Sequence, residues 1–148
     1  MKIRELLDTS EFRSRSNVMV GPNETVGSAV NKLIEYNIGS LPVCDDNGRP
    51  LGIITERDII RKSHNRETEI ATMRVDDIMS KNLVIATMDD DVDYAIDAMK
   101  QKKIRHLPLI DDNKVVGIIS MRDILGIQLE QANHRIRLLD DYISGGLR

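Results

Sequence analysis

The sequence contains one unit twice, and this repeat constrains the fold more than any other feature. Residues 25–60 align with residues 91–125 when Gly48 is skipped, and 14 of the aligned positions are then identical. A period near 65 is longer than the roughly 20 to 50 residues of solenoid repeats. We therefore expect two small units that pack against each other around a pseudo-twofold axis, so that a site in one unit has a counterpart in the other.

Composition limits where the protein works and what it binds. The 148 residues suit one domain or two half-domains with a shared core. The formal net charge of -3 argues against a nucleic acid or an anionic membrane held by a basic surface. The sequence has no apolar run of 18 residues and no signal-peptide core after Met1. The single Cys44 cannot form an internal disulfide, which fits the reducing cytoplasm. Together these features lead us to expect a cytoplasmic protein with no membrane or nucleic-acid partner.

Hydrophobic periodicity predicts an α/β (α+β) chain in which each unit has the order β-α-β-β-α. The expected elements of the first unit are 18–20, 25–37, 41–44, 51–54 and 55–63. Those of the second unit are 84–86, 91–102, 107–110, 115–119 and a last helix from 120 to about 142. Short segments at 3–7 and 75–79 correspond to each other, a polar loop is expected at 8–17, and a turn joins the first two paired strands at 45–48. The predicted divisions are 1–66, 67–128 and a helical extension at 129–148.

The motif at the start of the last helix in each unit is the main candidate for a site. It is Thr55-Glu56-Arg57-Asp58 in the first unit and Ser120-Met121-Arg122-Asp123 in the second. One interpretation is a capping box, in which the hydroxyl and the acid satisfy N–H groups at the helix start. However, an arginine in the first turn is disfavoured by the helix dipole. Its presence in both copies indicates a bound anion.

A nucleotide would satisfy each part of this motif. The N–H groups at a helix start, the hydroxyl and the arginine can donate to phosphate oxygens. The aspartate can accept from the vicinal hydroxyls of a ribose. The apolar strand before it, Ile53-Ile54 or Ile118-Ile119, offers a wall for a purine.

The doubled pattern resembles the cystathionine-β-synthase (CBS) domain family. A Leu-Pro strand followed by Asp-Asp, and then Gly-Ile-Ile-[Ser/Thr]-x-Arg-Asp-Ile, occurs in both units. Two such units in tandem are similar to a CBS pair, or Bateman module. The resemblance covers about residues 1–128 and implies sheet-to-sheet packing with two clefts. It implies an adenosine-containing ligand, namely AMP, ADP, ATP, NAD or S-adenosylmethionine.

The resemblance also assigns roles to residues. The ribose-binding position falls on Asp58 and Asp123, and the neighbouring hydroxyl on Thr55 and Ser120. The adenine slot is expected along the opening strand of the opposite unit and at the position before the Leu-Pro strand. These residues are Val18, Met19, Leu83, Val84, Ile38 and Ile104.

The two copies differ just before Leu-Pro. The first has Gly39-Ser40, whereas the second has Arg105-His106. Family members often place basic residues that contact phosphate here, which implies unequal phosphate affinity in the two clefts. The alternative is that Arg105 and His106 are solvated residues at a strand edge.

Other chemistry has little support. The three histidines and Cys44 lack metal-ligand spacing, and no phosphate-binding or nucleophile motif is present. We therefore predict a regulatory module without catalytic residues, resident cofactor or metal, which senses an adenine nucleotide and controls an unknown protein. A scaffold with vestigial clefts is the main alternative, and a nucleotide-hydrolysing enzyme is a more distant one.

The resemblance further implies a homodimer. In the last helix, apolar residues recur from Ile124 at Ile127, Leu138, Leu139 and Ile143. Gln128, Gln131 and His134 interrupt this stripe, so the pattern is too weak to predict a sustained coiled coil. The expectation is a helix that packs across a partner subunit or onto the segment 3–7, the alternative being an exposed tail.

Overall fold

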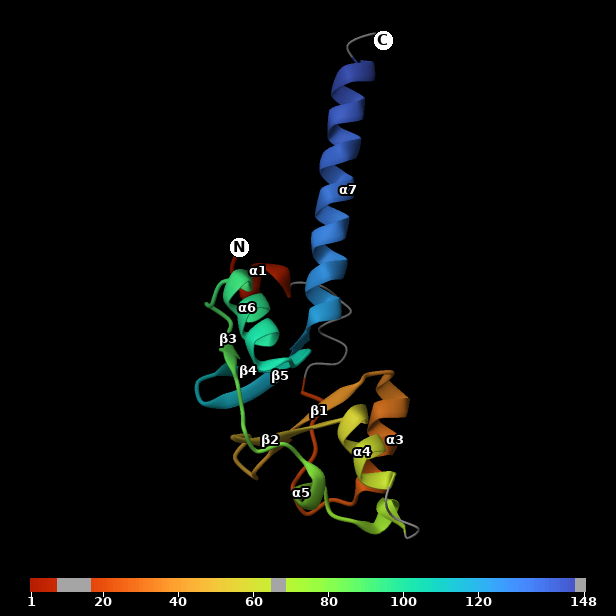
Figure 1. The fold of residues 1–148 in the computed structure, drawn as a ribbon. Coiled ribbons are helices and arrows are strands. Elements are labelled where there is room, and N and C mark those ends of the chain that lie inside the picture. The colour runs from red at the N-terminus through yellow and green to blue at the C-terminus, as the bar shows by residue number, and fades with distance from the viewer. Residues whose placement is uncertain (8–16, 65–68, 146–148) are drawn as a thin grey trace.

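The computed structural model describes residues 1–7, 17–64 and 69–145. It shows two halves stacked on each other, with a single long helix rising from one of them (Figure 1). The first half contains α3 (Val26–Tyr36), β1 (Ser40–Cys44), β2 (Pro50–Thr55) and α4 (Glu56–Ser63). The second half contains β3 (Ala86–Thr87), α6 (Val92–Lys102), β4 (His106–Asp111), β5 (Lys114–Ser120) and α7 (Met121–Gly145). The short elements are α1 (Ile3–Leu6), η1 (Ile70–Thr72) and α5 (Val75–Ile78).

The predicted elements are found, with small shifts at their ends. β1 pairs antiparallel with β2, and β4 with β5, and each hairpin has a register irregularity at the same position, after Val43 and after Leu109. The opening strand of the first half is shorter than predicted, because only Val20 pairs, in a parallel bridge with Val43. Its counterpart β3 pairs with β4 over two residues and begins at Ala86. Most of the predicted loop at 8–17 lies outside the described residues.

Each short N-terminal helix packs on the opposite half of the chain. Ile3, Leu6 and Leu7 belong to the core cluster of the second half, whereas Val75 and Ile78 belong to that of the first. Figure 1 shows α1 beside α6, although the two helices are far apart in the sequence. The exchange differs from the simple division into consecutive halves that the repeat suggested.

Backbone hydrogen bonds fix this exchange in the same way on both sides. The Val92 N–H donates to the Met1 carbonyl (3.0 Å), and the Val26 N–H donates to that of Met73 (2.7 Å). The Ile3 N–H donates to the Asp90 carbonyl (2.9 Å), as the Val75 N–H does to that of Glu24 (2.9 Å). The pseudo-twofold relation therefore extends to the segments that enter each half.

The two sheets meet around a small apolar cluster. Cys44, Ile110 and Val115 are buried there and Met19 packs against them. The Val115 N–H donates to the Gly48 carbonyl (3.0 Å), which joins the two hairpins. Burial, together with the nearby Asp45 charge, raises the pKa of the Cys44 thiol to about 11, so Cys44 stays protonated at neutral pH.

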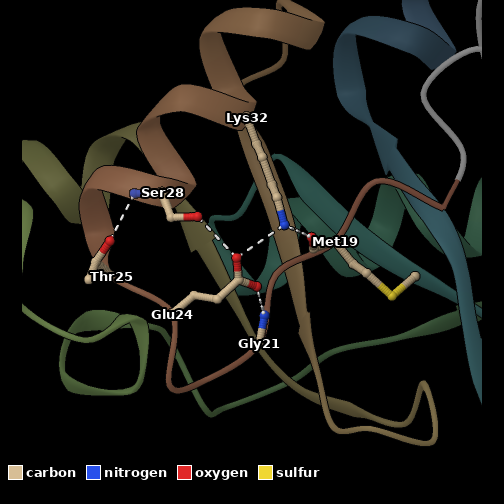
Figure 2. A network of polar contacts seen from close by, with 6 residues as sticks. All are labelled: Met19, Gly21, Glu24, Thr25, Ser28 and Lys32. Atoms are coloured by element: carbon tan, nitrogen blue, oxygen red, sulfur yellow. Dashed lines mark hydrogen bonds and ion pairs between the residues drawn. The ribbon is translucent and has the colours of Figure 1, made fainter.

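Glu24 ties the opening segment of the first half to α3 (Figure 2). Its carboxylate accepts from the Gly21 N–H (2.6 Å) and from the Ser28 hydroxyl (3.0 Å). Lys32 Nζ donates to the same carboxylate (3.3 Å) and to the Met19 carbonyl (2.7 Å). Residues 19–21 are thereby held in place at the side of the helix.

No helix among the residues that the structure describes combines the length and apolar character needed to cross a bilayer.

The Glu24 network predicts a pH-dependent contribution to stability. Partial burial alone would raise the pKa of Glu24, but the Gly21, Ser28 and Lys32 hydrogen bonds and the lysine charge lower it below its ordinary value of 4.5. A lowered pKa in the folded state means that the stabilisation is present above the unfolded-state pKa and is lost as pH falls through the folded-state pKa. We expect Glu24→Gln to lower the free energy of unfolding by about 1 kcal/mol at pH 7, a value discounted for the partial exposure of the carboxylate.

Urea unfolding at several pH values checks this expectation. The difference between wild type and Glu24→Gln should shrink below about pH 4.5. Glu35→Gln, on the exposed side of the same helix, is the control and should have little effect. A difference that does not change with pH would contradict the assignment.

Gly52 predicts a second stability effect. A Cβ at this position would lie 2.7 Å from the Ser80 carbonyl oxygen and 2.8 Å from Met79 Sδ. The backbone of Ser80 also exchanges two hydrogen bonds with Ile53 (2.9 and 3.0 Å), so it cannot withdraw without losing them. We expect Gly52→Ala to destabilise the protein by about 1 to 3 kcal/mol, measured by urea unfolding. Gly126→Ala, in exposed helix with open space around it, should instead be neutral or stabilising.

Candidate ligand clefts

Both copies of the helix-start motif form a capping box. The Thr55 N–H donates to Asp58 Oδ2 (3.0 Å), and the Asp58 N–H donates to Thr55 Oγ1 (3.1 Å). Ser120 and Asp123 repeat the arrangement at 2.9 and 3.1 Å. The capping interpretation is thus confirmed, and it positions each hydroxyl and carboxylate at the helix start.

Each motif also lines a cleft, so the capping role does not exclude a binding role. The larger cleft, of about 1420 Å³, is lined by Ser120, Arg122 and Asp123 and is called the Asp123 cleft. The smaller, of about 350 Å³, is lined by Thr55, Arg57 and Asp58 and is called the Asp58 cleft. The two clefts therefore follow the internal repeat.

Each cleft is built from both halves of the chain. Val18, Ile38 and Ser40 of the first half face the second-half motif in the Asp123 cleft. Leu83, Val84 and Ile104 of the second half face the first-half motif in the Asp58 cleft. This is the combination that the resemblance implied. Met19 is the exception, because it packs between the sheets and lines neither cleft.

Arg105 and His106 lie where the two clefts meet, and both residues line both clefts. Gly39 occupies the same border from the other half, and a Cβ placed on it would lie 3.7 Å from His106 Nε2. The contrast between Gly39-Ser40 and Arg105-His106 consequently does not assign the basic pair to one cleft. A phosphate near the border could meet Arg105 from either side.

The charges that distinguish the clefts come mainly from other residues. Four cationic side chains and two carboxylates line the Asp58 cleft, leaving His106 aside: Arg57, Arg61, Lys103, Arg105, Glu56 and Asp58. Two cationic side chains and three carboxylates line the Asp123 cleft: Arg105, Arg122, Glu56, Asp123 and Glu130. The formal charge of the lining is thus +2 in the Asp58 cleft and -1 in the Asp123 cleft.

The clefts also differ in apolar character. The Asp123 cleft carries additional apolar side chains from α3, α4 and the base of α7: Val30, Leu33, Ile34, Ile59, Ile60 and Ile127. Sequence reasoning missed these residues, and it also missed Arg61, Lys103 and Glu130. Arg61 lies one helical turn after Arg57, a spacing that could have indicated it, whereas Lys103 and Glu130 carry no such signal.

No group of three His, Cys, Asp or Glu side chains among the described residues is placed to hold a metal ion.

Comparisons with known proteins agree with this architecture. The sequence profile of the CBS domain matches residues 10–65 and again residues 75–130. The chain is 39% identical over 116 residues to an uncharacterized 17.7 kDa protein of Acidianus ambivalens, covering 78% of this chain and 69% of that protein. It is 38% identical over 125 residues to the inosine-5′-monophosphate dehydrogenase of Methanocaldococcus jannaschii, covering 84% of this chain but only 24% of the enzyme.

A solved structure provides the most informative likeness. It is the CBS domain pair of the protein MJ0100 in complex with 5′-methylthioadenosine and S-adenosyl-L-methionine. The TM-score is 0.73 at 28% identity, and the match covers 86% of this chain and 98% of that one. With two profile matches on the two halves that build the clefts, the chain belongs to the CBS domain family as a tandem CBS pair.

Proposed function

We propose that this CBS pair is a regulatory module that binds adenosine-containing ligands in its two clefts. The observation that carries the proposal is the composition of each cleft. A helix start with a hydroxyl, an arginine and an aspartate from one half faces apolar residues of the other half. The first group suits ribose and phosphate, and the second suits a purine ring.

The ligand complex of the relative supports the same class of ligand. MJ0100 is similar in fold and was solved with two adenosyl compounds. AMP, ADP, ATP, NAD and S-adenosylmethionine are all candidates. The proposed output is a change in cleft closure that alters a homodimer and, through it, a regulated protein. The module itself carries out no turnover in this proposal.

The charges predict which ligand prefers which cleft. The +2 lining of the Asp58 cleft favours the polyphosphate of ATP or ADP, because its cationic side chains can donate to several phosphate oxygens. The -1 lining of the larger, more apolar Asp123 cleft favours a ligand without phosphate, such as methylthioadenosine or the cationic S-adenosylmethionine. The two clefts thus serve different ligands.

A thermal-shift screen with AMP, ATP, NAD and S-adenosylmethionine tests the proposal first. A ligand at 100 times its Kd should stabilise the folded protein by about 2.7 kcal/mol. If neither these four ligands nor methylthioadenosine stabilises the protein, the scaffold alternative with vestigial clefts is favoured. Release of phosphate from ATP during incubation would instead indicate an enzyme.

The aspartates provide the residue-level prediction. Asp58→Ala and Asp123→Ala should each weaken binding in one cleft by about ten- to a hundredfold, since the hydrogen bonds to a carboxylate are lost. Calorimetric titration measures the affinities, and urea unfolding measures the separate cost of losing the cap. Asp93→Ala removes a first-turn acid outside both clefts and should leave binding unchanged. Unchanged affinity in both cleft variants would leave these acids with a capping role only.

Arg61 tests the charge difference. Arg61→Gln should lower the affinity for ATP about tenfold while changing the affinity for adenosine little, because only ATP brings phosphates to the Asp58 cleft. The matched control is Lys62→Gln, which removes a cation from the next position of α4 outside both clefts. Equal losses for ATP and adenosine would contradict a phosphate contact.

A further inference from the structure

The last helix extends well beyond the body of the protein. Ile124 is fully buried and Ile127 packs against the core of the second half, so the base of α7 is anchored. From residue 128 to 145 every side chain is exposed except that of Gln131, which is half-buried. Figure 1 shows this part of α7 rising alone from the fold. Most of the stability of a helix in a protein comes from the packing of an amphipathic face, so an unpacked helix of this kind is expected to have a partner surface.

The exposed part carries such a face. Apolar residues recur along it at alternating intervals of four and three residues, which is the spacing of the a and d positions of a coiled-coil heptad. They are Leu125, Leu129, Ala132, Ile136, Leu139 and Ile143. Leu129, Leu139 and Ile143 are 63%, 61% and 67% exposed, so one helix edge presents a continuous apolar seam to solvent.

This seam differs from the stripe considered in the sequence. That stripe began at Ile124 and Ile127, which the structure places against the core. A stripe counted from Ile124 combines residues on the core-facing side of α7 with residues on its exposed side. The polar residues then interrupt that stripe. Gln128, Gln131 and His134 occupy other positions of the heptad that starts at Leu125. Counted from Leu125, the heptad spacing is regular, in contrast to the stripe counted from Ile124.

The residue types point to two parallel strands. Two of the three a positions, Ile136 and Ile143, are β-branched, the third being Leu129. Two of the three d positions, Leu125 and Leu139, are leucine, the third being Ala132. β-Branched residues at a with leucine at d favour a parallel dimer.

Charge complementarity favours the same orientation. In a parallel, in-register dimer, a g residue lies near the e residue five positions later on the partner helix. Here Arg135 occupies g and Asp140 occupies e. Two copies of this chain would therefore pair these opposite charges twice.

We propose that residues 125–143 of α7 form a parallel two-stranded coiled coil with the same segment of a second copy of this chain. The proposal gives an interface to the homodimer of the proposed function and does not depend on ligand binding. Ligand titrations therefore test the proposed function, and measurements of molecular mass test the coiled coil, so that either proposal can be contradicted without the other.

Neighbouring leucines provide the test. Leu139 is at a d position, whereas Leu138 is at a c position outside the seam and is similarly exposed (61% and 54%). Analytical ultracentrifugation of the full chain should show a dimer at micromolar concentration. Leu139→Lys should raise the dimer dissociation constant about a hundredfold, because both subunits lose a seam leucine and bring two like charges together. Leu138→Lys should change the dimer dissociation constant by no more than a few-fold from that of the wild type.

The contrary results are equally clear. A monomeric wild-type chain, or a dimer that withstands Leu139→Lys, would overturn the coiled coil, and so would equal losses in the two variants. Circular dichroism and thermal unfolding of each variant check that the body stays folded. Both substitutions lie on exposed helix away from the core, so folding should be preserved.

Orientation has its own measurement. With Ile143→Cys, a parallel dimer places the two introduced thiols opposite each other, so mild oxidation should give a covalent dimer on a non-reducing gel. The native Cys44 is buried and protonated and does not compete. Ser144→Cys, at the next position and off the seam, should cross-link far less. Equal cross-linking of the two variants, or none, would overturn the parallel arrangement.

Discussion

The reciprocal exchange of α1 and α5 is the interaction on which the rest of the structure depends. Each half lacks part of its own core and receives it from the other: Ile3 and Leu6 enter the second half, and Val75 and Ile78 enter the first. A half isolated from the chain would expose these apolar positions and would leave backbone groups at the start of its main helix without partners. The two halves are therefore expected to fold as one unit.

The exchange also explains why the clefts are shared between halves. Because α5 is bound to the first half, the chain that follows it pairs with β2 at Ser80 and then passes Leu83 and Val84 into the Asp58 cleft. The segment around Val18 reaches the Asp123 cleft in the same way, held against α3 by Glu24 and Lys32. A ligand between a helix start and these segments would contact both halves, so its binding free energy would depend on the relative orientation of the two halves. This dependence is what a sensor requires.

Local signals in the sequence predicted local structure well. Thr25 was expected to begin α3 and caps it, and Asp45 closes the first hairpin turn with hydrogen bonds to two following N–H groups. The repeat predicted two related clefts. The helix exchange could not be predicted from periodicity, because an apolar face does not specify which half of a symmetric chain will cover it. The place of Met19 between the sheets and the approach of Lys103 to the Asp58 cleft likewise depend on tertiary packing.

The position of α7 relates the two proposals physically. Arg122, Asp123 and Ile127 at its base line the Asp123 cleft, whereas the seam that begins at Leu125 lies along another side of the same helix. A helix of 25 residues is about 37 Å long. A tilt of about 5° at the base therefore displaces the far end by about 3 Å, a shift comparable to half a helical turn. A coiled coil tolerates such displacement poorly, because each a and d side chain fits between four residues of the partner helix. A ligand that alters the tilt would change dimer affinity, and by reciprocity dimerisation would change ligand affinity by the same factor.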